Sequence, residues 1–319
     1  MAQEHSKTRI DLDWRSLRFE PLADRPSKVV LSDLGRPSQA GGSFPDWLDG
    51  LPNILAARGL KRLRDAIVEA HRGGRSIAAA LGGHVIKTGC APYLIDLVQR
   101  GVIDGFALNG SAAIHDLELA IAGRTSEDVG ARLASGEFGF ATETSELFAK
   151  ACDLAASNGR GLGEALGAVI TEHGGPGLDS SLLVAAYRAK ILLTVHVAIG
   201  TDIVHMNPKL DGAALGKATL DDFRLLCAYV AGLERGVWMN LGSAVVLPEV
   251  FLKTVSIVRN LGHSLDGLTT ANLDFEQKYR GLLNVLQRPG AEGVALTGHH
   301  EIMIPLLHAA VVSQLATEG

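Results

Sequence analysis

The 319-residue sequence has few cysteines, few aromatic side chains and no excess of basic residues. Its three cysteines, Cys90, Cys152 and Cys227, are widely spaced and form no Cys-x-x-Cys pair, which excludes a zinc-type arrangement and favours a reducing cytoplasm. Aromatic residues make up 5% of the chain and the net charge is −5, so no basic surplus or row of stacking aromatics could neutralise phosphates and bases. Nucleic acid is therefore not an expected partner.

Long hydrophobic runs are also missing. No stretch of about 18 uninterrupted apolar residues occurs, so no membrane span is expected. The first residues, MAQEHSKTRIDLDW, are polar rather than basic and then apolar, which argues against a secretion signal. Both observations predict a soluble, cytoplasmic protein without a membrane partner.

Hydrophobic residues and glycine are the abundant classes. The chain is 47% hydrophobic and contains 37 glycines, a composition typical of aliphatic strands joined to helices by tight turns. Residues 1–50 are rich in Pro, Asp, Arg and Gly without any period, which predicts an extended arm able to wrap a partner subunit. Residues 51–319 contain no internal repeat or sharp change of composition, so we expect one α/β domain there.

Strand and helix patterns alternate from residue 76 onward. Strand 76–81, helix 91–100 and strand 103–108 form a βαβ unit, which predicts a parallel sheet. Helix 112–121 follows, and residues 124–190 are mostly helical. At least five parallel strands are expected, the later ones at 191–200, 237–242, 264–272 and from residue 293.

Ligands of open parallel sheets bind outside the carboxyl ends of the strands, where helix N-termini and free N–H groups point. Gly-x-Gly-x-x-Gly and Walker-type sequences are absent, and each turn taken alone is explained by chain reversal. Small residues nevertheless follow five predicted strands, which suits the close approach of a dinucleotide. They are Gly82, Gly83 and His84; Asn109, Gly110 and Ser111; Gly200, Thr201 and Asp202; Asn240, Gly242 and Ser243; and Thr269, Thr270 and Ala271.

Residues 83–116, GHVIKTGCAPYLIDLVQRGVIDGFALNGSAAIHD, resemble the first half of the NAD site of deoxyhypusine synthases. Similarity resumes at WMNLGSAVVLPEV and DGLTTANLDF, where that family has Leu-Gly-Gly-Gly-Val and Asn-Thr-Ala. The resemblance implies a three-layer Rossmann-like fold with a mostly parallel sheet, NAD as cofactor and a homotetramer. The cofactor-binding positions that it implies are Thr88, Gly89, Asn109, Gly110, Ser111, Gly242, Ser243, Thr270 and Ala271, with Asp116 retained.

The sequence departs from that family at its catalytic lysine. The Trp-Gly-Lys stretch that carries the imine-forming lysine is absent, and KYRGLLNVLQRPGAEG stands in its place. Lys278 is the residue able to substitute, and Pro248 or Glu249 replaces the family's active-site histidine. Usual deoxyhypusine synthesis is therefore not expected.

The segment LNGSAAIHDLE, residues 108–118, also resembles the NAD-binding domain of archaeal-type ornithine cyclodeaminases. Both families use NAD for a transient hydride abstraction from a carbon that bears an amine. The resemblance therefore implies an NAD-dependent enzyme acting on an amine, polyamine or amino acid.

Two histidines are acid–base candidates because of their positions in the predicted sheet. His84 and His115 lie after predicted strand ends, and histidine titrates near neutrality. With Glu249 and Lys278 they form the predicted catalytic set. Glu249, Asp266, Asp274 and Glu276 would supply an acidic rim for an amine, and His196 is expected in the core.

Two other functions remain open. A non-catalytic nucleotide-binding or assembly protein would keep the sheet and lose the lysine. A metal-assisted hydrolase would use Asp202 and His205, although a helix cap with a nearby surface histidine is the favoured explanation of that pair. The adjacent His299 and His300 would point to opposite faces of a strand. No metal site is predicted.

Overall fold

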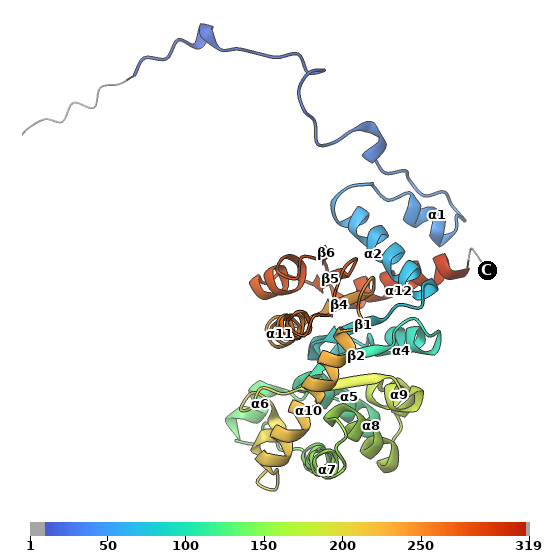
Figure 1. Ribbon diagram of the computed structural model, residues 1–319, viewed down its shortest axis with the longest axis vertical. Helices are drawn as coiled ribbons and strands as arrows, with labels where there is room; N and C mark the ends of the chain where they lie inside the picture. Colours follow the sequence, from blue (N-terminus) through green and yellow to red (C-terminus); the bar gives the residue numbers. More distant parts are fainter. Residues whose placement is uncertain (1–9, 317–319) are drawn as a thin grey trace, which may run out of the picture.

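The computed structural model describes residues 10–316, and its centre is one sheet of six parallel strands in the order β3-β2-β1-β4-β5-β6 (Figure 1). The predicted α/β class with a mostly parallel, Rossmann-like sheet is confirmed. The strands are β1 Ile77–Leu81, β2 Gly105–Asn109, β3 Leu192–His196, β4 Val237–Leu241, β5 Thr269–Asp274 and β6 Glu292–Thr297.

Both faces of the sheet are covered by helices, because strands β1 to β5 are buried on both sides, whereas the edge strand β6 buries only Val294 and Leu296. Alternate residues such as Ala79 and Leu81 pack into one core, while Ala78 and Ala80 pack into a second core on the other face. Helices α10 Gly212–Val230 and α11 Val246–Asn260, with the π-helical turn Gly281–Gln287, cover the second core. This arrangement is a three-layer fold.

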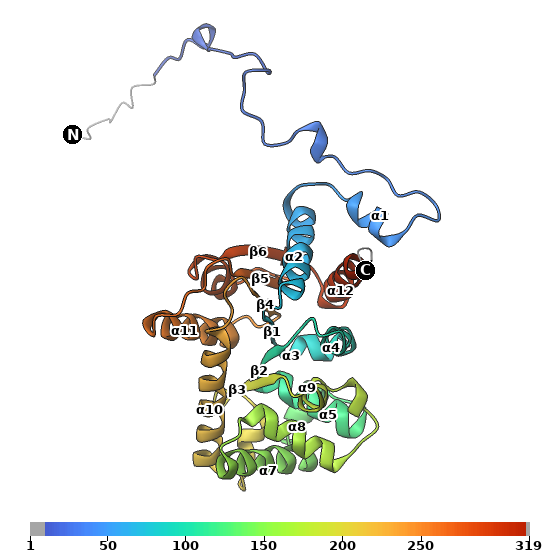
Figure 2. The same ribbon diagram turned by 45° about the vertical axis from the view of Figure 1, so that its right-hand side comes forward.

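The larger core lies under the remaining helices and extends beyond the edge strand β3 (Figure 2). Residues 124–190 form the predicted helical region, whose helices pack on β3 and α5. The helices other than α1, α10 and α11 are α2 Leu55–Arg72, α3 Gly83–Lys87, α4 Ala91–Gln99, α5 Gly110–Ala122, α6 Val129–Ala134, α7 Thr142–Asn158, α8 Leu162–His173, α9 Leu182–Ala189 and α12 His300–Ala316.

Residues 10–43 extend away from the sheet in both views (Figures 1 and 2). They contain only the short 3-10 turns Trp14–Ser16 and Leu31–Asp33, and their side chains are almost all exposed. Helix α1, Phe44–Asp49, begins before the expected boundary at residue 50 and packs against α12. Within residues 10–316, no helix combines the length and hydrophobicity needed to cross a bilayer.

Two predicted strand boundaries are wrong. The strand expected at 191–200 ends at His196, so Gly200, Thr201 and Asp202 lie four to six residues beyond its end. The expected strand 264–272 begins five residues late and runs from Thr269 to Asp274, because Gly267 with φ of 70° still belongs to the preceding turn. Thr270 and Ala271 therefore lie inside β5, paired with Trp238 and Met239 of β4, and do not follow its carboxyl end. Asp274 occupies that end instead.

The turns after β1 and β4 meet backbone to backbone. Gly82 N donates to Leu241 O at 2.9 Å, and a Cβ built on Gly82 would lie 2.1 Å from Gly242 O. Because the obstacle is a main-chain carbonyl directly after strand β4, any side chain at residue 82 would force the two turns apart.

We expect Gly82→Ala to lower the free energy of unfolding by about 2 kcal/mol, because the added methyl overpacks this contact. Gly216→Ala is the matched control: a methyl there meets nothing within 4 Å, and removing a helical glycine raises stability by up to about 1 kcal/mol. Urea unfolding of both variants tests this, and a wild-type midpoint for Gly82→Ala would contradict it.

Candidate functional site

The candidate site lies at the carboxyl ends of β1 and β4, where the strand order reverses. Chain connections lead from β1 toward β2 and β3 on one side, and from β4 toward β5 and β6 on the other. Such a reversal is the point at which open α/β sheets bind ligands. Gly82 and Gly83 follow β1 here, and Gly242 and Ser243 follow β4.

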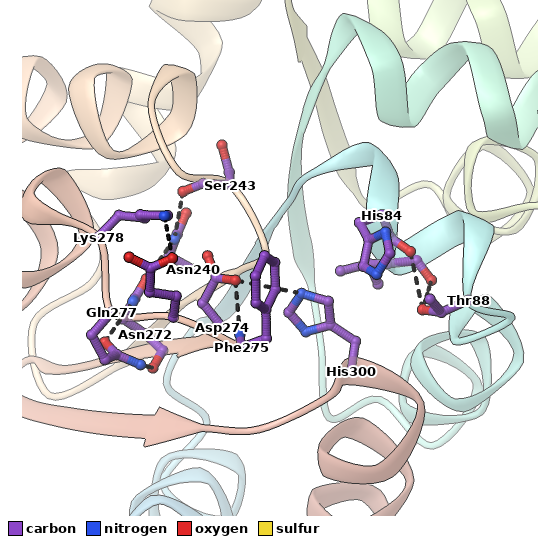
Figure 3. A network of polar contacts seen from close by, with 12 residues as sticks. His84, Thr88, Asn240, Ser243, Asn272, Asp274, Phe275, Gln277, Lys278 and His300 are labelled. Carbon is purple, nitrogen blue, oxygen red and sulfur yellow. Dashed lines mark hydrogen bonds and ion pairs between the residues drawn. The ribbon is translucent and has the colours of Figure 1, made fainter. Parts of the chain in front are cut away.

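A cluster of rings closes over these turns (Figure 3). The His84 ring lies 5.7 Å from the His300 ring and 6.4 Å from the Phe275 ring, measured between centroids. His84 and Phe275 are exposed, whereas His300 is 1% exposed. Gly242 has φ of 65°, and a Cβ there would lie 2.5 Å from His300 Nε2, so only glycine leaves room for the imidazole.

His300 is buried without hydrogen bonds. Neither ring nitrogen has a partner in the part of the chain that the structure describes. Burial lowers the pKa of His300, while the Asp274 carboxylate, 4.0 Å from Nε2, acts to raise it. The imidazole is therefore neutral at pH 7, with one donor and one acceptor available to a ligand or water.

Side-chain amides connect the ends of β4, β5 and β6 (Figure 3). Asn240 Nδ2 donates to Asn272 Oδ1 at 2.6 Å, and Asn272 Nδ2 donates to Gln277 Oε1 at 2.8 Å. Gln277 Nε2 in turn donates to Leu296 O. This chain fixes the loop after β5, and it leaves the buried Asn240 Oδ1 without a partner among residues 10–316.

His115 faces the β1 turn from the first half of α5. Thr125 has a single hydroxyl proton, which it donates to Glu118 Oε2, so it accepts from His115 Nδ1–H at 2.7 Å. His115 Nε2 then carries the free lone pair. Burial, followed by the charge of Lys87, lowers the pKa of His115 to about 4, so the ring is neutral near pH 7 and Nε2 can accept a hydrogen bond.

The predicted cofactor positions near β1 and β2 lie at this edge of the sheet, but most of their polar atoms are already in use. Thr88 Oγ1 donates to His84 O at 3.0 Å, and Gly89 has φ of 76° in the turn that follows. Asn109 Oδ1 accepts from Ala112 N and caps α5. Ser111 Oγ would be 2.3 Å from a Cβ on Gly83, so the two turns are in contact.

The carboxyl end of β3 reaches the same edge through Asp202. A Cβ on Gly110 would lie 2.1 Å from Asp202 Oδ2, an oxygen that is buried and has no partner among the described residues. His205 Nδ1 accepts from Gly200 N at 3.1 Å and from Asp202 N at 3.3 Å, across the start of the 3-10 turn Ile203–Met206. Residues 10–316 contain no group of three His, Cys, Asp or Glu side chains able to hold a metal ion.

Three positions that the sequence comparison implied for the NAD site lie away from the turns after β1 and β4. Asp116 is fully buried and accepts from Ser181 Oγ, Leu182 N and Leu183 N, so it caps α9. Thr270 and Ala271 are buried at the amino end of β5. These positions serve the packing of the fold.

Glu249 and Lys278 are held in ion pairs beside the site. Glu249 binds Lys253 at 3.0 Å and Arg280 at 3.0 Å, and these bonds lower the pKa of its carboxyl. Lys278 pairs with Glu276. Both side chains are partly exposed, so a ligand can exchange with these partners at small cost.

Sequence reasoning named Asn240 among the residues at the predicted strand ends, but it gave no catalytic or cofactor-binding role to Asn240, Asn272 or His300. A signal for the two asparagines was present, because an amide inside an otherwise apolar strand must find a partner when buried. His300 was placed on a strand beside His299, whereas it begins helix α12 and its ring turns inward.

His196 at the end of β3 makes stability depend on pH. Burial lowers its pKa to about 4, compared with about 6.5 in the unfolded chain. The unfolded state therefore binds more protons, and the contribution to stability is present above pH 6.5 and is lost as the pH falls toward 4. We expect a loss of up to about 3 kcal/mol.

The comparison that isolates this residue is urea unfolding of wild type and His196→Gln at several pH values. The glutamine can still bond to the Thr194 hydroxyl, 2.9 Å from His196 Nε2. The variant should lose less stability on acidification. Parallel losses in both proteins would show that His196 does not control the effect.

No family model and no curated protein matches the sequence, but solved structures match the fold. A conserved candidate LOR/SDH protein from Methanococcus maripaludis S2 has a TM-score of 0.52 at 15% identity, covering 80% of this chain and 69% of that one. AgrE, solved with ornithine and NAD+, has a TM-score of 0.53 at 13% identity, covering 81% and 33%. A candidate deoxyhypusine synthase from Entamoeba histolytica has 0.50 at 10%, covering 88% and 96%.

These likenesses are structural, and the chain spans about a third of the length of AgrE. The candidate deoxyhypusine synthase is matched over almost its whole length. The resemblances in the sequence to deoxyhypusine synthases and to the NAD-binding part of ornithine cyclodeaminases thus find counterparts of the same fold. The chain has the Rossmann-like α/β fold that these proteins share.

Proposed function

We propose that this protein binds NAD at the β1/β4 strand ends and uses it as a transient hydride acceptor for an amine or amino acid. The supporting observation is the set of buried, unpartnered polar atoms at the point where the strand order reverses. His300 and Asn240 supply these atoms around the Gly242 turn. Buried polar groups without partners cost about 1–3 kcal/mol each, which a polar ligand would recover.

The donor and acceptor groups fit a dinucleotide, although the arrangement differs from the usual fingerprint. The carboxylate that commonly binds a ribose from the end of β2 is replaced by Asn109, whose side chain caps α5. Asp202, from the end of β3, brings an unpartnered carboxylate oxygen beside Gly110. We assign the ribose contact to Asp202 and the contacts nearer the reacting end to Ser111, Gly242 and Ser243.

Bound NAD would supply a carbon that accepts a hydride from the substrate. His115 would accept a hydrogen bond at Nε2 from a proton of the substrate ammonium, because its ring is neutral and Nδ1 is held by Thr125. His84, exposed at the rim, would exchange that proton with solvent. Glu249 and Glu276 would attract the cationic substrate once their present partners move aside.

AgrE binds ornithine and NAD+ in its crystal structure, which makes ornithine and polyamines the first substrates to test here. The Trp-Gly-Lys stretch of deoxyhypusine synthases is absent from this sequence. We assign the role of the missing lysine to Lys278. Deoxyhypusine synthesis by the usual imine route is therefore not part of the proposal.

A non-catalytic nucleotide-binding or assembly role is the second candidate. The observation that favours it is that Lys278 and Glu249 are both engaged in ion pairs. Such a protein would bind NAD and show no turnover.

The proposal includes a homo-oligomer, such as the tetramer of deoxyhypusine synthases, in the cytoplasm. Apolar side chains along the arm remain uncovered in the single chain, with Trp14 73% and Phe19 91% exposed. Exposed apolar surface of this kind is typical of subunit contacts. All three cysteines are free, as a reducing compartment requires.

NAD binding is measured by calorimetry and by thermal shift with NAD, NADH and NADP. Saturation at about 100 times the dissociation constant stabilises a protein by roughly 2.7 kcal/mol. His84→Ala should weaken binding about tenfold, since its ring borders the site. His263→Ala is the control, because His263 is exposed and distant in sequence from every strand-end turn. Absence of binding to the wild type would refute the proposal.

The Lys278→Met variant distinguishes the enzyme hypothesis from the non-catalytic hypothesis. We expect the variant to bind NAD as the wild type does and to lose at least 100-fold in turnover of ornithine, putrescine or spermidine, as expected when a covalent catalyst is removed. Lys150→Met, which removes an exposed lysine that pairs with Glu172 on α8, is the matched control. Wild-type protein that binds NAD and turns over none of these amines would favour the non-catalytic role.

A further inference from the structure

A cavity of about 610 Å³ lies at the other end of the sheet, where β3 begins. Its walls come from the first turn of α8, the end of α9, the start of β3 and one face of α10. The volume falls within the range of small-molecule sites, about 300–1,000 Å³. The strand-end site and its proposed cofactor play no part in it.

The inner walls of the cavity are apolar. Leu183 and Leu193 are buried and Ile191 is half-buried, and all three line the space. Helix α8 lies very close to the edge strand, since a Cβ on Gly163 would be 2.0 Å from Leu193 O. The wall formed where α8 meets β3 therefore consists of rigid main chain.

The mouth of the cavity is basic. Arg160, Arg188 and Lys190 line it, and all three are exposed. Arg160 pairs with Glu164 at 3.4 Å and Arg188 with Asp179 at 2.9 Å, both in contact with solvent. Lys190 has no ion pair within residues 10–316, so positive charge is left over at the rim.

Asp222 forms the floor. Its Oδ2 accepts from Gly163 N at 2.9 Å and Val195 N at 2.6 Å, which caps α8 and protects the edge strand. Its Oδ1 is buried and has no partner among the described residues. Burial raises the pKa of Asp222 to about 7, so near neutrality the floor carries only part of a negative charge.

We propose that this cavity binds an amphipathic anion, with an apolar body against Leu183 and Leu193 and a carboxylate or phosphate at Arg188 and Lys190. The apolar body gains from leaving water. The headgroup stays at the solvent-exposed rim, where pairing with two cations costs little desolvation. Carboxylate and phosphate share this chemistry, and separate probes distinguish them.

The test is displacement of 1-anilinonaphthalene-8-sulfonate fluorescence from the full chain by decanoate, decyl phosphate and decylamine. Decanoate or decyl phosphate should displace the probe, and decylamine should not. Arg188→Glu with Lys190→Glu should weaken decanoate binding at least tenfold, and the glutamine pair at the same positions should weaken it less.

Arg25→Glu with Lys28→Glu is the matched control. It makes the same charge change on the arm and reports any probe bound to the arm's apolar side chains. Equal displacement by decylamine, or unchanged decanoate affinity in the rim variants, would overturn the proposal. Displacement affected only by the arm variant would overturn it too.

Decanoate affinity should fall as the pH rises from 6 to 8, because Asp222 then becomes a full anion below the ligand. The other titratable or charged groups at the cavity are Arg160 just before α8, Glu164 on α8, Tyr187 and Arg188 on α9, Lys190 after the end of α9, and Asp221 beside Asp222 on α10. Asp222→Asn keeps an acceptor for Gly163 N and Val195 N and should remove this pH dependence. The same dependence in the variant would assign it to another group.

Discussion

The contact between the β1 and β4 turns is the constraint on which the candidate site depends. Gly82 packs its main chain against Gly242 O, and Gly242 in turn leaves space for the His300 ring. Gly82, Gly242 and His300 come from different parts of the chain. They fit together only because residues 82 and 242 have no side chain. The reversal of strand order between β1 and β4 sets the position of the site, and the glycines allow the two turns to touch there.

Buried polar groups are handled in two ways in this molecule. Asp116 accepts three hydrogen bonds and ties α5 to α9, so burial of its carboxylate stabilises the helical region beside β3. His300, Asn240 and Asp202, by contrast, lie at the carboxyl edge of the sheet with atoms that have no partner among the described residues. Unsatisfied buried groups call for an explanation such as an unseen ligand or water. Their concentration at this edge supports a polar ligand there.

Much of the fold could be predicted from the sequence. The apolar strands and the βαβ spacing indicated a parallel sheet, and the two-residue period within each strand places its side chains on opposite faces. The strand end at Asn109 was located by the same reasoning, whereas the one at Asp274 was missed. The segment 264–272 contains Gly267 and polar residues, and no break in the sequence pattern separates them from β5. The pattern therefore did not show where this strand begins.

The sequence by itself determined the α/β class, the glycine-bearing turns and the set of histidines and acids that could serve chemistry. Periodicity and composition are local properties, and they suffice for these. Only the tertiary structure decided which of those residues meet. In the structure, His300 lies in the site, Asp116 caps a helix and Asp202 lies against Gly110. Each of these contacts joins segments that are far apart in the chain. Pairings at such separations depend on strand order and helix packing, which no local pattern specifies.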